Sequence, residues 1–197
     1  MADATNKKLY GTELIRKYGF WKIVGEDFDA NFRDWTEPGF RALFIYRFGV
    51  WRKTIRFWPL RKAIGFIYVL LYRHVRNHYT IQLHDSCFIG RRLRIAHQGA
   101  INIHRFSSIG DDCIIRLGVT LGAPGSEVTV DTAPVLGDRV DLGVGAVIIG
   151  KVLIGDDASI GPNVVVQTNI KPGSLVVQAP PRIIPGFIKP PKVAEET

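Results

Sequence analysis

The sequence predicts an all-β left-handed parallel β-helix of hexapeptide repeats, preceded by an α-helical N-terminal region. Aliphatic residues recur at every sixth position in three blocks, as parallel β-helix repeats require. They are Leu83, Ile89 and Ile95; Ile103, Ile109, Ile115 and Leu121; and Leu136, Leu142, Ile148, Ile154, Ile160 and Val166. Glycine follows four residues of the last block, and its tolerance of positive φ suits sharp corners. Residues six apart do not share one helical face, which argues against an amphipathic helix.

The N-terminal region, residues 1–80, is expected to be helical over 12–24, 39–53 and 60–77. Thr12 is a candidate N-cap, and Pro59 marks the start of the last helix. The net charge of +8 is concentrated here, because residues 38–84 contain no Asp or Glu. The basic residues of this stretch are Arg41, Arg47, Arg52, Lys53, Arg56, Arg61, Lys62, Arg73 and Arg76, with aromatic residues between them.

Two interpretations of this basic, aromatic stretch stay open. Cationic helices with Trp and Phe on one face are typical of peripheral membrane contact, here through residues 38–80 on the inner face of the membrane. Alternatively, the helices form a lid whose apolar side packs on the β-helix or on another subunit and leaves the arginines solvated. A nucleic-acid partner is not expected, because no nucleic-acid-binding motif is present.

The β-helix domain is expected over residues 81–170, with three hexads closing each triangular coil. Two departures from the six-residue rhythm interrupt it. Two extra residues bulge out within the segment AHQGAIN, and the segment GAPGSEVTVDTAP, residues 122–134, leaves the coil as an extruded loop. Extrusions from a rigid scaffold are common places for functional residues. The prolines of residues 171–197 predict a last partial coil and then an extended tail.

The remaining composition favours a cytoplasmic protein with reduced cysteines and no metal. No run reaches the roughly 18 apolar residues of a membrane-spanning helix, and the N-terminus lacks a secretory signal. Cys87 and Cys113 each precede a core position by two residues, which predicts small buried side chains rather than a disulfide. His74 and His78 have a spacing that suits metal chelation, but no third ligand lies nearby.

His97 is the candidate catalytic residue, because it lies in the two-residue bulge between small neighbours. An imidazole with an ordinary pKa near 6.5 can accept a proton at physiological pH and act as a general base. A surface histidine held by a backbone carbonyl is an equally open interpretation.

The segments RIAHQGAINIHRFSSIGDDCIIRLGVTLGAPG and LGDRVDLGVGAVIIGKVLIGDDASIGPNVVV resemble the hexapeptide-repeat acyltransferases of the serine acetyltransferase type. The resemblance runs from about residue 37 to 185. It implies a homotrimer with acetyl-CoA in a groove between neighbouring β-helices. It also implies that His97 deprotonates an acceptor hydroxyl, which attacks the thioester directly without a metal.

The resemblance further implies cofactor-binding positions. Backbone groups at Gly122, Ala123, Val144 and Gly145 are expected along the pantetheine arm, and Arg182 near the nucleotide phosphates; a tight corner is the simpler explanation for each glycine. His104 and Arg116 are possible accessory or acceptor-binding residues. A corner-capping histidine and a solvated arginine are the alternatives.

Three departures from the family pattern concern the acceptor. Ala96 replaces the aspartate before the histidine, Ala133 replaces a second histidine, and Gln82 replaces the aspartate that pairs with the catalytic histidine. These changes favour the branch that O-acetylates saccharides in capsular or exopolysaccharide biosynthesis, with an acceptor that a membrane lipid could carry. The alternatives are a catalytically silent β-helix that scaffolds a partner, a serine acetyltransferase with an altered pocket, and a carbonic anhydrase-like metalloenzyme.

Overall fold

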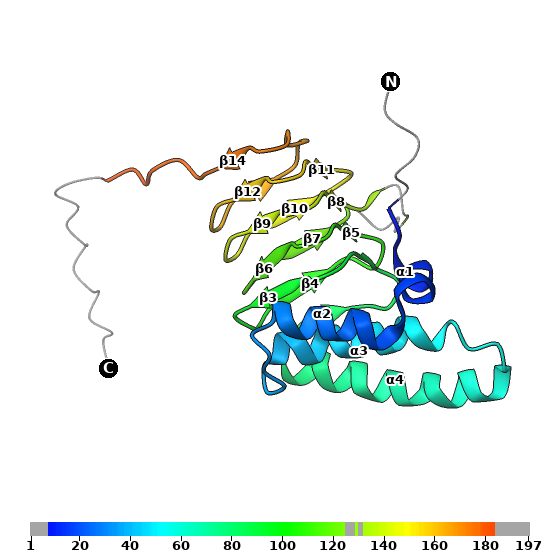
Figure 1. Cartoon of the computed structure of the whole chain (residues 1–197). Helices are drawn as coiled ribbons and strands as arrows, with labels where there is room; N and C mark the ends of the chain where they lie inside the picture. The colour runs from blue at the N-terminus through cyan, green and yellow to red at the C-terminus, as the bar shows by residue number, and fades with distance from the viewer. Residues whose placement is uncertain (1–7, 125–128, 130–131, 184–197) are drawn as a thin grey trace, which may run out of the picture.

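A computed structural model of the chain describes residues 8–124, 129 and 132–183, and it confirms the predicted fold (Figure 1). A layer of helices covers one end of a parallel β-helix. The helices are α1 (Gly11–Tyr18), α2 (Phe20–Ala30), α3 (Pro38–Arg52) and α4 (Trp58–His78). The single helix expected over 12–24 is wrong, because Gly19, with φ 85°, breaks it into α1 and α2. α3 and α4 each begin with a proline in the first turn, where a backbone N–H is not needed.

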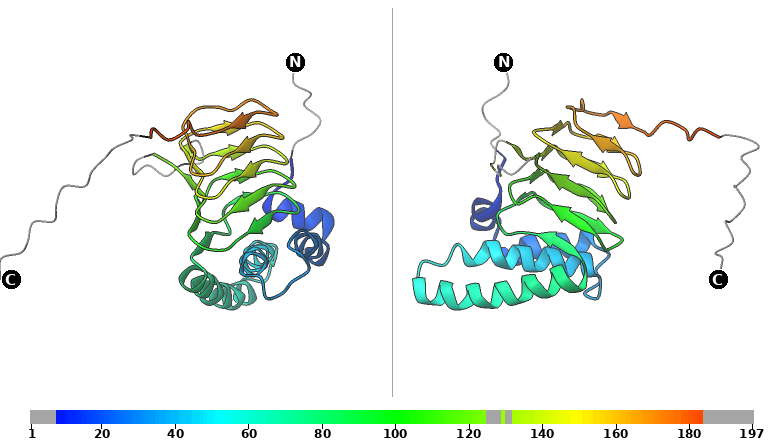
Figure 2. Two further views of the ribbon diagram at one scale, coloured as in Figure 1. Left: turned by 90° about the vertical axis from the view of Figure 1, so that its left-hand side faces the viewer. Right: turned by 180° about the vertical axis from the view of Figure 1, so that it is seen from behind.

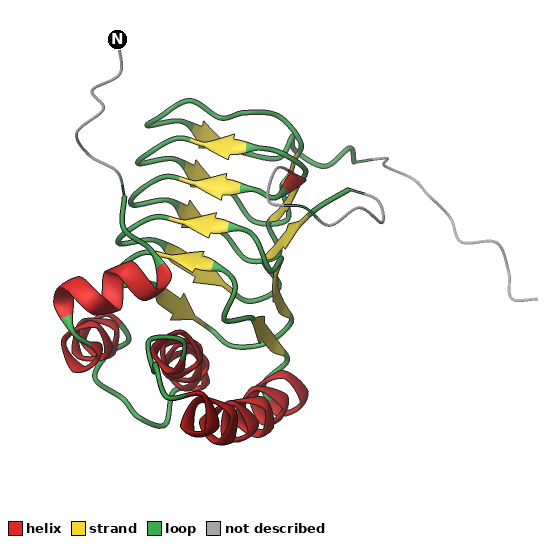
Figure 3. Cartoon of the chain, turned by 90° about the vertical axis from the view of Figure 1, so that its right-hand side faces the viewer, coloured by secondary structure: helices red, strands yellow, loops and turns green. Residues whose placement is uncertain are grey.

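Short parallel strands form the three faces of the β-helix (Figures 1 and 3). The first face stacks β1 (Ile81–Leu83), β4 (Ile101–Ile103), β7 (Thr120–Gly122), β10 (Val147–Ile149) and β13 (Val165–Val166). The second stacks β2 (Phe88–Ile89), β5 (Ser108–Ile109), β8 (Val135–Leu136) and β11 (Leu153–Ile154). The third stacks β3 (Arg94–Ala96), β6 (Ile114–Arg116), β9 (Asp141–Leu142), β12 (Ser159–Ile160) and β14 (Leu175–Val176).

The strand register locates both departures from the repeat. Val147 pairs with Val165, a separation of three hexads, whereas Ile81 pairs with Ile101, two residues further along the chain. The two extra residues lie in the bulge that contains His97. Between β7 and β8 the chain leaves the coil, although Gly122 is still paired in β7, so the excursion begins after it and not at residue 122. Residues 125–128 and 130–131 of this excursion lie outside the described residues.

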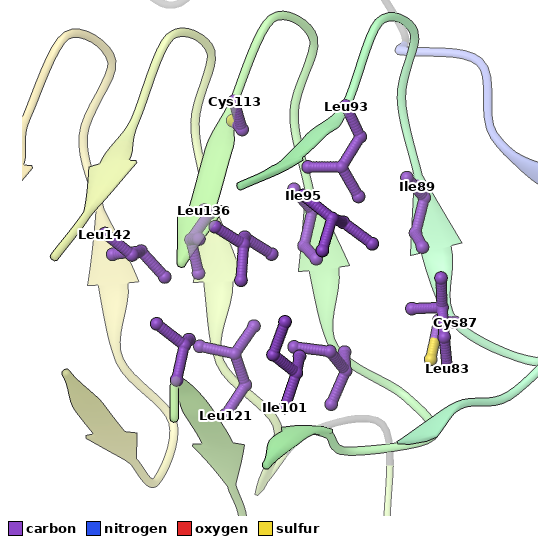
Figure 4. Packing of buried hydrophobic residues seen from close by; sticks show 14 of the residues in the cluster. Leu83, Cys87, Ile89, Leu93, Ile95, Ile101, Cys113, Leu121, Leu136 and Leu142 are labelled. Carbon is purple, nitrogen blue, oxygen red and sulfur yellow. The ribbon is translucent and has the colours of Figure 1, made fainter. Parts of the chain in front are cut away.

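The aliphatic residues of the hexads point into the prism and form its core (Figure 4). Ile89, Leu142 and Ile154 are fully buried, like most residues at equivalent positions. Cys87 and Cys113 are free and buried among them, as the sequence predicts. Burial raises the pKa of both thiols to about 12.

The helical layer is attached to the first coil through α3. Arg47 is 1% exposed and pairs with the equally buried Asp27 of α2, with 2.7 Å between Nε and Oδ2. The same guanidinium donates to the carbonyl oxygens of Ile89 and Gly90, at the corner of the first coil. The lid interpretation therefore describes α3, but its expectation of solvated arginines is wrong for Arg47, whose charge is balanced by Asp27 inside the interface.

Candidate functional site

His97 lies on the corner between β3 and β4, on the coil next to the helical layer. Its side chain is exposed and its backbone adopts a positive φ of 59°. Hydrogen bonds fix the end of the bulge next to β4, since the Gly99 carbonyl accepts from Gly118 N at 3.0 Å and Ala100 N donates to Thr80 Oγ1 at 2.8 Å. Within the described residues no group hydrogen-bonds the His97 ring, so no backbone carbonyl holds it. A rigid loop thus presents a free imidazole to solvent.

The corner that carries His97 continues along the axis of the β-helix. On the next coil it is formed by Leu117 and Gly118, and on the following coil by Val144 and Gly145. Backbone hydrogen bonds connect these levels, with Gly145 N donating to the Leu117 carbonyl at 2.8 Å. Leu117 and Val144 are 38% and 36% exposed. The structure therefore brings His97, Val144 and Gly145 onto one edge that is lined by apolar side chains.

Gly122 and Ala123 lie at the opposite end of the first face. The Gly122 carbonyl accepts from Gly150 N at 3.0 Å, and Gly122 pairs with Ile149 of β10. Of the four candidate cofactor residues near the prism, Val144 and Gly145 therefore lie just before the start of β10. Gly122 and Ala123 lie at the end of β7. Arg182 does not join them in this chain, because it lies exposed in the tail that runs away from the β-helix beyond β14 (Figure 2).

The two glycines differ in what the fold requires of them. Gly145 has φ 69°, and an added Cβ would lie 2.2 Å from Asn163 Oδ1, so the corner itself demands glycine. An added Cβ at Gly122 would have no neighbouring atom closer than 3.8 Å, and its φ is ordinary. Corner geometry therefore explains Gly145 but not Gly122.

Arg116 lies one coil above His97, since it pairs in register with Ala96. Its guanidinium is bonded to the carboxylate of Asp141, with Nη2 at 3.2 Å from Oδ2, and Nη1 also approaches the Leu142 carbonyl. The positive charge of Arg116 is thus balanced within the chain, and it is neither free for an anionic acceptor nor simply solvated.

His104 lies at the far end of β4 from His97, so the two imidazoles do not converge. Its backbone N donates to the Leu121 carbonyl at 2.8 Å, and its Nδ1 accepts from Phe106 N at 3.4 Å. Burial, with a smaller contribution from Arg105, lowers the pKa of His104. Its Nε2 is buried without a partner in the described chain. These contacts fit the corner-capping interpretation of His104.

The first face beside His97 presents amides and no carboxylate. Gln82 of β1 and Asn102 of β4 are exposed and directly paired. Ala96 and Ala133 are buried. The exposure of Asn102 follows from its place between the core residues Ile101 and Ile103, but Asn102 was not among the predicted site residues. Thr80, which fixes the bulge, was also missed, because its positive φ of 55° has no signature in the sequence.

Two histidines with a spacing that suits metal chelation lie on α4. His74 and His78 stack on α4 with ring centroids 5.2 Å apart. Across the described residues, no group of three or more His, Cys, Asp or Glu side chains is arranged to hold a metal ion. This described part of the chain also contains no helix long and apolar enough to cross a membrane.

Comparisons with known proteins agree on one family, although no family model matches the chain. The chain is 36% identical over 175 residues to a serine acetyltransferase of Helicobacter pylori, an alignment that covers 87% of the chain and 97% of that protein. It is 34% identical over 149 residues to a serine acetyltransferase of Mycobacterium tuberculosis, covering 75% of the chain and 61% of the relative.

Solved structures give the same result. A soybean serine acetyltransferase in complex with serine superposes with a TM-score of 0.67 at 25% identity, covering 84% of the chain and 69% of the soybean protein. The prediction of an acyltransferase that uses acetyl-CoA is thereby confirmed, whereas these relatives, all named serine acetyltransferase, do not support the polysaccharide branch. The chain belongs to the serine acetyltransferase family of hexapeptide-repeat acyltransferases.

Proposed function

We propose that this chain transfers the acetyl group of acetyl-CoA to an acceptor hydroxyl, with His97 as the general base. One observation carries the proposal: within the family's fold, an exposed imidazole that hydrogen-bonds no other described residue stands on the apolar edge formed by Leu117 and Val144. His97 takes the hydroxyl proton while the oxygen attacks the thioester carbonyl. The C–S bond then breaks, and the proton passes to the departing thiolate.

The co-substrate is proposed to lie along this edge in a homotrimer. A prism corner is convex, so one chain alone cannot enclose a long ligand, and a neighbouring β-helix would supply the second wall. Val144 and Gly145 would then face the pantetheine arm on one side, with Gly122 and Ala123 at the other end of the same strands. Arg182 lies in the exposed tail, so the position of the tail would decide whether Arg182 contacts the nucleotide phosphates. Its guanidinium is positively charged and therefore suited to bind phosphate.

The acceptor best supported by the relatives is serine, bound in an altered pocket. All the relatives compared are named serine acetyltransferases. In this chain Gln82 and Asn102 present amides beside His97, and these can donate to a carboxylate or accept from a hydroxyl. A sugar hydroxyl, as in polysaccharide biosynthesis, is the second candidate. A sugar acceptor is favoured by the absence of a carboxylate at Ala96 and Gln82, because the ammonium group of serine would have no negatively charged partner at these positions.

The test is release of coenzyme A thiol from acetyl-CoA with L-serine, L-homoserine and a panel of neutral saccharides as acceptors. His97→Asn, which keeps the size of the ring but cannot accept the proton, should lower kcat by about a hundred- to ten-thousandfold. His104→Asn is the matched control and should retain most activity. Equal turnover by His97→Asn and the wild type would remove His97 from the mechanism. Absence of both turnover and acetyl-CoA binding in the wild type would favour the scaffold interpretation.

A further inference from the structure

The helix α4 leaves one side of itself uncovered. Its inner side packs on the rest of the chain through Tyr68 and Val75, which are buried. The opposite side, here called the outer face of α4, consists of Leu60, Phe66, Ile67 and Leu70. Ile67 follows Leu60 by seven residues, and Leu70 follows Ile67 by three and Phe66 by four, which places the four side chains on one side of the helix. Phe66 is 67% exposed and Leu70 is 50% exposed, which is unusual for such large apolar side chains grouped together.

This apolar surface continues onto α3 and α2. A cavity of about 340 Å³ is lined only by the aromatic residues Phe20, Trp21, Phe44, Phe48 and Trp51. Phe44 also lines a second groove, which it shares with Leu71 and His74 of α4. Because one side chain borders both hollows, the aromatic cavity and α4 form one surface. Arg47, on another side of α3, bonds to the first coil, and α3 and α4 lie side by side at the end of the β-helix (Figure 1).

Positive charge borders the outer face of α4. Lys62, Arg73 and Arg76, the basic flank, lie along one side of the stripe, and residues 38–84 contain no acidic residue. In the described chain none of the three forms an ion pair with a carboxylate. Arg52 and Lys53 differ, since both pair with Asp85. The basic flank is therefore available to an external anion.

We infer that the outer face of α4, together with the aromatic cavity, docks on an anionic lipid surface. An amphipathic helix with aromatic and aliphatic residues on one side and lysine and arginine beside them lies in the plane of a membrane interface. α4 fits this geometry and is not apolar enough to cross a membrane. A second copy of the chain is the weaker occupant, because two basic flanks would face each other across a symmetric contact. Docking of this kind does not depend on acetyl transfer.

Co-sedimentation of the whole protein with phosphatidylcholine vesicles, with or without an equal share of phosphatidylglycerol, tests this inference. The protein should bind the anionic vesicles, bind the neutral ones much less, and dissociate as salt is raised. Lys62→Gln with Arg73→Gln should weaken binding about 25-fold, because each basic residue near an anionic surface contributes about fivefold. Phe66→Glu with Leu70→Glu should abolish binding. Ile183→Glu is the matched control, since Ile183 is 84% exposed in the tail, and it should bind normally.

Three results would overturn the inference. The first is a wild-type protein that binds neither vesicle, and the second is equal binding to both, which would leave no role for the basic flank. The third concerns size: if the Phe66→Glu, Leu70→Glu variant forms a smaller assembly than the wild type in solution, the outer face of α4 is a subunit contact instead. Circular dichroism of each variant shows whether its helices are retained, and a blue shift of the fluorescence of Trp21, which lines the aromatic cavity and is 74% exposed, identified with Trp21→Phe, reports insertion.

Discussion

Replacing Arg47 with methionine tests how the helical layer is held on the β-helix. The change keeps much of the apolar stem but removes a guanidinium that binds Asp27 and two carbonyl oxygens of the first coil. Burial raises the pKa of Asp27, and attraction to Arg47 opposes that shift. Without Arg47, the Asp27 carboxylate must stay charged in a dry site or take up a proton.

The expected loss is large relative to the stability of such a domain. Removing one partner of a buried ion pair costs about 3–5 kcal/mol. Since folded proteins are stable by only about 5–15 kcal/mol, Arg47→Met should lose roughly a fifth or more of the free energy of unfolding. The helices anchored by Arg47 lie on the coil that carries His97, so the loss also reaches the proposed site.

Urea denaturation followed by circular dichroism measures this loss, at one fixed protein concentration because the proposed homotrimer would contribute to stability. The double variant Asp27→Asn, Arg47→Met should recover part of the loss, since it no longer buries an unpaired charge. Arg33→Met is the control: Arg33 pairs with Asp29 on the surface, where removal should have no measurable effect. If Arg47→Met is as stable as Arg33→Met, the reasoning about the interface is wrong.

Two further predictions concern pH and the co-substrate. Hydrogen bonds from Arg91 lower the pKa of Glu26, so this contact stabilises the fold above pH 4.5, the ordinary value, and is lost as pH falls through the lower folded-state pKa. Glu26→Gln should therefore flatten the acid end of a stability–pH curve, and an unchanged curve would contradict this. Gly122→Ala should raise KM for acetyl-CoA several-fold while the melting temperature stays constant; a lower melting temperature with unchanged KM would assign Gly122 a structural role.

Much of the fold was predictable because the hexads repeat one local rule. Each aliphatic residue points inward for the same reason as its neighbour six positions earlier, so the pattern reinforces itself over many turns. The helical layer offers no such repetition. The break at Gly19 is a local C-cap, with glycine at positive φ after Arg16 and Lys17. The burial of Arg47 depends on contacts with distant segments, and a buried arginine cannot be told from a solvated one by its sequence neighbours.

The candidate site was predictable to a similar, partial extent. The change in repeat length near His97 indicated a bulge, and the register of β1 with β4 shows where its two extra residues go. The separation of His104 from His97 depends on where the strand between them begins and ends, because β4 (Ile101–Ile103) places the two histidines at its opposite ends. Nor was the pairing of Arg116 with Asp141, which brings together residues 25 positions apart on adjacent coils.

Gly122 and Gly145 illustrate what the structure adds to a motif. In the sequence both are small residues at the ends of hexads, and both match positions expected beside the pantetheine arm. The structure separates them, because Gly145 would be required by its positive φ and by Asn163 even in a protein that bound nothing. Gly122 has open space where a Cβ would stand, so a larger side chain would fit the fold. A glycine that the fold does not require is the better candidate for close approach of a ligand to the backbone, which makes Gly122 the more informative position to change.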